Sequence, residues 1–237
     1  PPRSTLFPYT TLFRSSHTCD SHDGHTWIVV VPPKENAQGE KCPIYVKTEH
    51  WDSIDTDKKE IVGHIPQVPR TYGYTYGFYG LMNEHQLTLG ESTFDGRHEL
   101  VSQNGILNCY EMTRLVIERC KTAREAIALI DELTKTYGYT DVGECLTLAD
   151  TQEVWHLEIV GPGKDKEGKD LKGAVWAAIR IPDDHVGVCA NSSRIMQLDL
   201  GSPDCLASSN VFQVAIDNGW WDPKSGKIGR ASCRERV

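Results

Sequence analysis

The sequence predicts an α+β domain, because strand-forming stretches lie on both sides of a single helical region. Short β-branched or alternating stretches occur within residues 26–94, and four more occur within residues 145–190. Between them, residues 108–137 carry the strong helical signal of the chain. Strands, then a pair of helices, then strands again favour a mainly antiparallel sheet with helices layered on it.

The N-terminal strands are predicted from β-branched runs and from alternation. Residues 26–31 form an apolar run that ends at Pro32 and Pro33, and residues 44–47 form a shorter strand. Residues 34–41 are expected to be loop, residues 49–59 an acidic turn-like segment, and residues 66–80 extended chain. Residues 86–94 alternate with a period of two, which places Leu87 and Leu89 on one face of a strand.

Two helices are predicted from their capping residues. Asn108 with Glu111, and Thr122 with Glu125, each fit a capping box, in which two side chains satisfy free backbone N–H groups at the start of a helix. The segment is therefore expected to form helices over residues 109–120 and 123–135, and Gly138 marks the stop of the second. Strands are expected to resume at residues 145–149, 153–160, 174–180 and 186–190, with residues 161–173 as a hairpin loop.

The two ends are expected to be translated sequencing adapter. One DNA sequence that can encode residues 228–237 has a reverse complement that encodes residues 6–14 in another frame. We therefore expect residues 1–15 and 228–237 to be artefacts, and residues 16–227 to be an internal part of a longer domain. The ends hold five arginines and one glutamate, so the segment between them is more acidic than the whole chain.

Composition excludes several classes of protein. The chain has 237 residues, a formal net charge of −8 and 39% hydrophobic residues, with no apolar run of membrane-spanning length. These values exclude a membrane span, a disordered tail and a nucleic-acid-binding surface. The eight cysteines form no C-x-x-C pair, which argues against a disulfide framework and favours a cytoplasmic location. A secreted or periplasmic location is the alternative, and no oligomeric state is predicted.

The densest polar cluster lies at residues 17–25. His17, Cys19, His22 and His25 could hold a zinc ion, or Cys19 could act as a nucleophile with His17 or His22 as its base. Neither alternative has a recognised spacing. The chain also lacks a G-x-S-x-G elbow and phosphate-binding glycine patterns. Four separate histidines are interpreted as satisfied surface or core groups, namely His50, His64, His98 and His156.

Residues 79–97, which read YGLMNEHQLTLGESTFDGR, resemble the core motif of the C69 family of dipeptidases. Further similarities follow in the same order at residues 118–126, 137–158, 175–183 and 190–195, so the resemblance covers residues 16–221. It implies a four-layer αββα sandwich of the N-terminal-nucleophile hydrolases, incomplete here at both ends. It also implies hydrolysis of dipeptides without a metal or an organic cofactor.

The resemblance implies a mechanism in which the thiol of an N-terminal cysteine attacks the amide carbonyl and its own α-amine accepts the proton. Asp20 would orient that cysteine, Asn191 would contact the substrate, and Thr93 would donate a hydrogen bond to the oxyanion. The cysteine itself is expected upstream of Asp20, where the sequence reads as adapter. The nucleophile is therefore expected to be missing from this chain, which should be inactive by itself.

A dipeptide carries an ammonium and a carboxylate, so its site needs an acid and a cation. We expect Glu91 to bind the ammonium, and Arg97 or Arg194 to bind the carboxylate. Two alternatives remain open. One is an N-acyl amide hydrolase similar to the bile-salt hydrolases and penicillin acylases, or a secernin-like relative. The other is a metal-binding module built on the cluster at residues 17–25.

Overall fold

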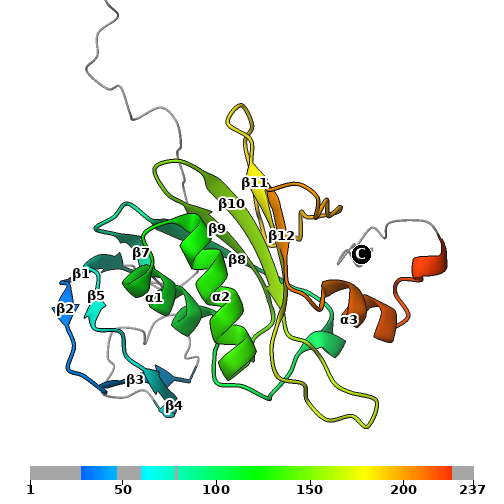
Figure 1. The fold of residues 1–237 in the computed structure, drawn as a ribbon, viewed down its shortest axis with the longest axis horizontal. Helices are drawn as coiled ribbons and strands as arrows, with labels where there is room; N and C mark the ends of the chain where they lie inside the picture. Colours follow the sequence, from blue (N-terminus) through cyan, green and yellow to red (C-terminus); the bar gives the residue numbers. More distant parts are fainter. Residues whose placement is uncertain (1–27, 47–59, 78–79, 226–237) are drawn as a thin grey trace, which may run out of the picture.

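The computed structural model describes residues 28–46, 60–77 and 80–225. One eight-stranded sheet forms the centre of this part of the chain (Figure 1). Its strands, in spatial order, are β1 (Val29–Val31), β6 (Tyr74–Tyr76), β7 (Gly80–Asn83), β8 (Thr88–Asp95), β9 (Gly143–Ala149), β10 (Val154–Val160), β11 (Val175–Ile181) and β12 (Cys205–Ala207). All neighbouring strands run antiparallel, as the sequence predicts.

Two helices cover one face of this sheet (Figure 1). They are α1 (Cys109–Arg119) and α2 (Ala123–Tyr137). The side chain of Asn108 accepts a hydrogen bond from the N–H of Glu111, and that of Thr122 accepts one from the N–H of Glu125. Both helices and both caps are therefore confirmed, and α2 extends to Tyr137 before Gly138 ends it with a φ of 74°.

The main core lies between the two helices and the sheet. Leu87, just before β8, and alternate residues of β8, β9 and β10 face the helices. These side chains are almost fully buried, namely Leu87, Leu89, Leu146, Leu148, Trp155, Leu157 and Ile159. The helices contribute a matching apolar stripe that includes Met112, Val116, Ala126 and Ile130. Burial of this apolar surface is the main source of stability for the sheet and the two helices.

The opposite face of the sheet is covered by a different part of the chain. Helix α3 (Val211–Asp217) packs through Val211 and Val214 against Val160 and Val175, which alternate with the residues that face α1 and α2. The segment that follows β11 also lies on this face, where Ile195 and Leu198 are buried with Cys205. Two short 3-10 helices, η2 (His98–Leu100) and η3 (Pro223–Ser225), complete this part of the structure.

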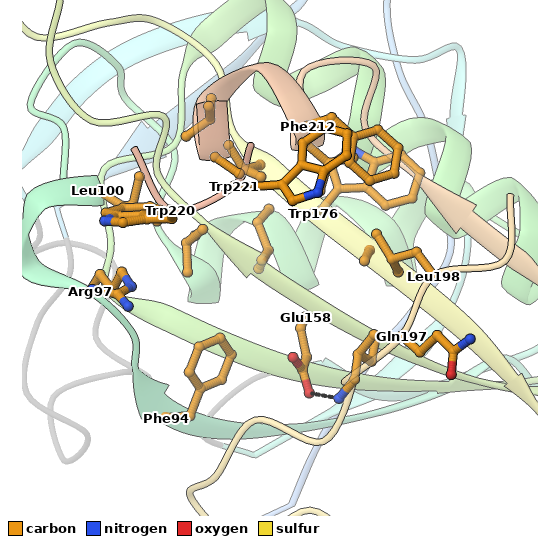
Figure 2. Close-up of a pocket in the computed structure, with 18 residues that line it drawn as sticks. Phe94, Arg97, Leu100, Glu158, Trp176, Gln197, Leu198, Phe212, Trp220 and Trp221 are labelled. Atoms are coloured by element: carbon orange, nitrogen blue, oxygen red, sulfur yellow. Dashed lines mark hydrogen bonds between the residues drawn. The ribbon is translucent and has the colours of Figure 1, made fainter. Parts of the chain in front are cut away.

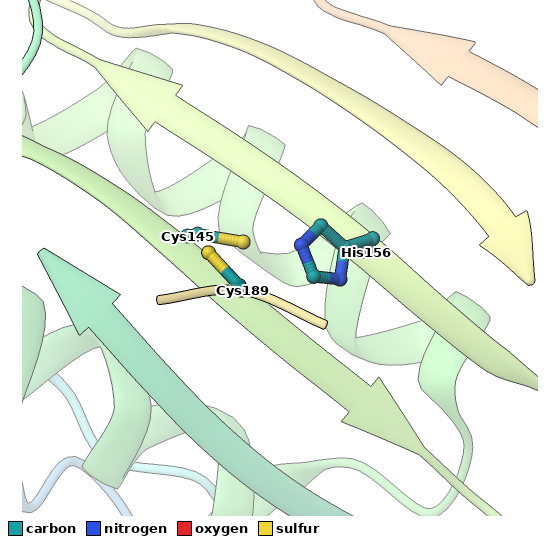
Figure 3. Close-up of side chains that lie close together, drawn as sticks. All are labelled: Cys145, His156 and Cys189. Atoms are coloured by element: carbon teal, nitrogen blue, oxygen red, sulfur yellow. The ribbon is translucent and has the colours of Figure 1, made fainter. Parts of the chain in front are cut away.

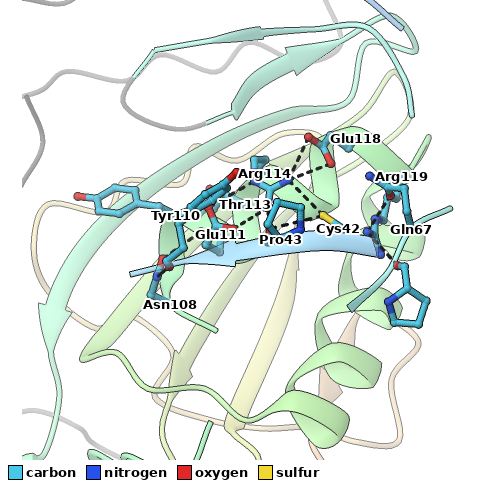
Figure 4. A network of polar contacts seen from close by, with 12 residues as sticks. Cys42, Pro43, Gln67, Asn108, Tyr110, Glu111, Thr113, Arg114, Glu118 and Arg119 are labelled. Atoms are coloured by element: carbon cyan, nitrogen blue, oxygen red, sulfur yellow. Dashed lines mark hydrogen bonds and ion pairs between the residues drawn. The ribbon is translucent and has the colours of Figure 1, made fainter. Parts of the chain in front are cut away.

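Two small hairpin-like sheets extend the structure beyond β1. Strand β2 (Lys34–Glu35) pairs with β5 (Arg70–Thr71), and β3 (Lys41–Tyr45) pairs with β4 (Ile61–Pro66). A polar network joins the second pair to α1 (Figure 4). The Arg114 guanidinium lies 2.5 Å from Glu111 and 3.3 Å from Glu118, and it donates a 2.9 Å hydrogen bond to the carbonyl oxygen of Pro43. Both glutamates are buried, so this arginine neutralises charge inside the protein.

Several expected elements need correction. Residues 186–190 form no strand, and Val186 and Val188 are 88% and 62% exposed. The place beside β11 is taken instead by β12, which the sequence did not predict. Residues 34–35 and 61–66 form strands where none was expected, and β3 begins at Lys41. Helix α3 was also missed, because no side chain caps its N-terminus.

The cluster at residues 17–25, the segment 49–59 and both proposed adapter segments lie outside the described residues. Within the part that the structure describes, no helix has the length and apolar character needed to cross a membrane.

Candidate functional site

The segment that follows β11 is attached to the sheet through Asn191. The backbone N–H of Asn191 donates a hydrogen bond of 2.8 Å to Ser92 Oγ, and its side-chain amide donates one of 2.8 Å to the carbonyl oxygen of Thr93. The φ of Asn191 is 48°, in the left-handed region that asparagine enters more easily than most residues. The two hydrogen bonds hold Asn191 in this conformation at an exposed position of the sheet face.

A buried carboxylate fixes the residues immediately after Asn191. Glu158 on β10 is 8% exposed and accepts hydrogen bonds from the Ser193 hydroxyl and from the backbone N–H groups of Arg194 and Ile195. Hydrogen bonds to a carboxylate are stronger than those between neutral groups. Glu158 therefore holds the segment against the sheet, and the geometry of Asn191 depends on it.

A cavity of about 200 Å³ lies beside this segment, between the sheet and α3 (Figure 2). Its walls are mainly apolar and include Phe94, Leu198, Phe212 and Trp221. Arg97 and Glu158 also line the cavity. The guanidinium of Arg97 lies 4.4 Å from the ring centre of Trp220, in cation–π contact. The site thus offers an apolar chamber with a cation and a carboxylate in its walls.

Two cysteines and a histidine gather on the same face of the sheet (Figure 3). The Sγ atoms of Cys145 and Cys189 and a ring nitrogen of His156 all lie within 4.8 Å of one another. A hydrogen bond from Cys145, together with the nearby His156, lowers the pKa of Cys189 to about 4, although burial acts in the opposite direction. That same hydrogen bond, with burial, raises the pKa of Cys145. His156 is therefore part of a cluster, which corrects its interpretation as a separate, satisfied histidine.

The structure brings some of the predicted site residues together. Asn191 contacts the backbone of Thr93, but the Thr93 hydroxyl donates a 3.0 Å hydrogen bond to Glu144. Arg97 lies in the cavity wall. Arg194 has an exposed side chain, and its backbone N–H binds Glu158.

Glu91 lies on the other side of the sheet. It pairs across the strands with Leu146, which faces α1 and α2, whereas Glu158 pairs with Cys145 on the opposite face. Side chains alternate between the two faces of a strand. Glu91 therefore does not share the cavity with Arg97. Asp20 lies outside the described residues.

The sequence did not single out Ser92 or Glu158. The alternation of β8 places Ser92 on the face away from Leu87 and Leu89. This alternation is the sequence pattern that could have identified Ser92 as a residue of the site face. Nothing local in the sequence shows that residues 189–195 pack on that face, because the contact joins positions almost 100 residues apart.

Comparison with known proteins gives consistent results. The model of peptidase family C69 matches residues 43–229. A probable dipeptidase B of Lactococcus lactis subsp. lactis (strain IL1403) is 35% identical over 109 residues, which cover 46% of this chain and 20% of the relative. A probable dipeptidase B of Streptococcus pyogenes serotype M1 is 32% identical over 114 residues, covering 48% of this chain and 20% of the relative.

A probable dipeptidase of Latilactobacillus sakei is 30% identical over 112 residues, which cover 47% of this chain and 21% of the relative. The chain therefore matches about a fifth of the length of each of these curated relatives.

Proposed function

The chain belongs to peptidase family C69, and we propose that the protein of which it is a part is a cysteine-type dipeptidase. The observation that carries this proposal is the family match over residues 43–229. Relatives named as dipeptidases at 30–35% identity support a dipeptide as the substrate. The reaction is hydrolysis of the single peptide bond of that dipeptide.

In this proposal the nucleophile is the thiol of an N-terminal cysteine upstream of Asp20. Its own α-amine, whose pKa is ordinarily about 7.7 to 8.0, accepts the proton at neutral pH, so no histidine is required as a base. The thiol adds to the amide carbonyl and forms a thioester as the amine product leaves with a proton. Water then hydrolyses the thioester. Asp20 is proposed to orient the cysteine.

The four-layer sandwich is also part of the proposal. Helices α1 and α2 would form one outer layer and the eight-stranded sheet the layer beneath it. The second sheet would pack on the face that carries Asn191 and Glu158, beside α3 and the segment after β11, which cover part of that face. This arrangement is supported by the position of Asn191, since a substrate held between the two sheets would contact that face.

Asn191 is proposed to hold the substrate through its side-chain oxygen and its backbone. Its N–H groups are engaged with Ser92 and Thr93, so its conformation is set before the substrate binds. Arg97 is proposed to attract the substrate carboxylate from the cavity wall. The Thr93 hydroxyl donates its hydrogen bond to Glu144. Thr93 therefore contacts Asn191 through its backbone carbonyl oxygen and not through its hydroxyl.

Substitution of Asn191 in the complete enzyme tests this role. We expect Asn191→Ala to lower kcat for dipeptides by about 10²-fold, the usual cost of losing one positioning hydrogen-bond group. Asn191→Gly is the matched control, because glycine accepts a φ of 48° without strain. It should lose a similar amount of activity while unfolding less easily than Asn191→Ala. Full activity in both variants would contradict the assignment.

A second candidate is hydrolysis of N-acyl amides, which the apolar cavity beside Asn191 favours. The two functions differ in the group on the carbonyl side of the scissile bond, which carries a free ammonium in a dipeptide and none in an N-acyl amide. Rates with a free dipeptide and with the same dipeptide acylated at its N-terminus separate them. The proposed function requires faster cleavage of the free dipeptide, and a preference for the acylated form would support the second candidate.

A further inference from the structure

We propose that Cys145, His156 and Cys189 form a binding site for a thiophilic metal ion, of which Zn²⁺ is the representative. Its residues differ from those of the histidine cluster at residues 17–25 and from the proposed catalytic cysteine. It is built from two adjacent strands and from the segment that follows β11, so it exists only in the folded protein.

The backbone places the three ligands in a suitable arrangement. Cys145 on β9 pairs with Glu158, and His156 on β10 pairs with Thr147, so Cys145 and His156 are diagonal neighbours on one face of the sheet. Cys189 approaches the same face from the following loop, and the three ligand atoms lie within 4.8 Å of one another. With Zn–S bonds of about 2.3 Å, tetrahedral ligand atoms are about 3.8 Å apart. Small side-chain adjustments would therefore complete the site.

His156 provides an independent indication of a ligand. The residue is 5% exposed, and its Nε2 atom is buried with no hydrogen-bond partner among the described residues. Figure 3 shows the imidazole edge turned toward the two sulfur atoms. Leaving a buried polar atom without a partner is unfavourable, because the atom has lost its hydrogen bonds to water. A metal ion bound at this nitrogen would remove that cost.

The chemistry of the three side chains suits a thiophilic metal ion. Such ions bind cysteine thiolates and neutral imidazole, and the cluster offers two cysteines and one histidine. Any proton that the two thiols carry is released to solvent when the ion binds. Two thiolates then neutralise the charge of Zn²⁺. Cys145 is buried, but Cys189 is only half-buried and its neighbours Val188 and Ala190 are exposed, so an ion can enter from the loop side.

Metal binding to the purified 237-residue chain tests the proposal. The metal-free protein is titrated with Zn²⁺ against a chromophoric chelator, and with Co²⁺ to detect thiolate-to-metal absorption. We expect one site, and we expect Cys189→Ser and His156→Gln each to weaken binding by about 100-fold or more, because each variant removes a ligand. Cys205→Ser is the matched control, since Cys205 is also buried but lies on β12 outside the cluster.

A triple variant with His17, His22 and His25 replaced by alanine separates this site from the N-terminal cluster. It should bind Zn²⁺ like the unmodified chain. Loss of binding in this variant alone, unchanged binding in Cys189→Ser, or absence of binding in the unmodified chain would each overturn the proposal.

A measurement without substitutions covers the case in which a variant does not fold. Saturating Zn²⁺ should protect Cys189 from alkylation by iodoacetamide by at least about tenfold, measured by mass spectrometry of the unmodified chain. Equal labelling of Cys189 with Zn²⁺ and with a chelator would overturn the proposal as well.

Discussion

Cys189 and Cys120 show how strongly the surroundings of a thiol change its chemistry. Burial raises the pKa of Cys120 to about 12, whereas the Cys145 hydrogen bond and His156 lower that of Cys189 to about 4. The two pKa values differ because Cys120, at the end of α1, lies in an apolar part of the core, whereas Cys189 lies beside groups that stabilise a negative charge.

The first prediction concerns the reactivity of Cys189 in the metal-free chain. Its lowered pKa lies below the range from pH 6 to pH 8, so the thiolate is present throughout and the alkylation rate should stay nearly constant. A thiol with an ordinary pKa of about 8.5 gains reactivity by about 75-fold over the same range, because its thiolate fraction rises by that factor. Rates at Cys189 are followed by mass spectrometry, with a small-molecule thiol as reference. A tenfold increase for each pH unit would show that its pKa is not lowered.

The second prediction concerns Gly138, the residue that ends α2. A Cβ atom at this position would lie 2.2 Å from the carbonyl oxygen of Asn104 and 2.7 Å from Gly105 Cα. Gly138→Ala should therefore lower the free energy of unfolding by about 3 kcal/mol, the sum of a left-handed backbone and a backbone clash. Urea unfolding measures the change.

Gly168 is the matched control for this substitution, because its φ is 81° but no atom lies within 4 Å of an added Cβ. Gly168→Ala should cost only about 1 kcal/mol, the contribution of the left-handed backbone. Equal losses at the two glycines would mean that the close approach of residues 104–105 to Gly138 does not exist in solution.

At the scale of elements, Arg114 joins α1 to the β3–β4 pair. Its guanidinium contacts Glu111, Glu118 and the Pro43 carbonyl in a partly enclosed space (Figure 4). Arg114→Met should lower the free energy of unfolding by about 3–5 kcal/mol, because it leaves two buried carboxylates without a counter-charge. Chemical denaturation measures this loss.

Lys34→Ala serves as the control for Arg114, because it removes the ion pair between Lys34 and Glu40 on the surface. Exposed pairs contribute about 1 kcal/mol or less. If Arg114→Met cost no more than this control, the network would not be a structural link between α1 and β3. A compensated variant with Arg114→Met, Glu111→Gln and Glu118→Gln should recover part of the stability.

The elements that could be predicted are those with local signals. Capping boxes at Asn108 and Thr122 define α1 and α2, and the alternation around Leu87 and Leu89 defines β8 and its buried face. Residues 186–190 have the alternation of a strand, but β12 pairs with β11 in their place. Pairing between strands depends on distant residues, so the pattern of one segment does not decide it.

At the scale of the whole molecule, the sequence could predict the family and the antiparallel sheet with its helical layer. The role of Asn191 in the site stays a prediction from the resemblance. The alternation with Leu87 and Leu89 could have placed Glu91 on the face that α1 and α2 cover. The sequence could not predict the support that Glu158 gives to residues 193–195, because this depends on how the segment after β11 packs on β10. The Cys145–His156–Cys189 cluster has the same origin, since its members are separated along the chain.

The proposed function makes this chain part of a dipeptidase that uses an N-terminal cysteine. The most direct test is hydrolysis of dipeptides by the protein extended upstream to that cysteine, compared with the same protein carrying alanine in its place. We expect release of free amino acids by the first protein in the presence of a chelator, and none by the second or by the 237-residue chain. Hydrolysis that survives the cysteine substitution, or that a chelator abolishes, would contradict it.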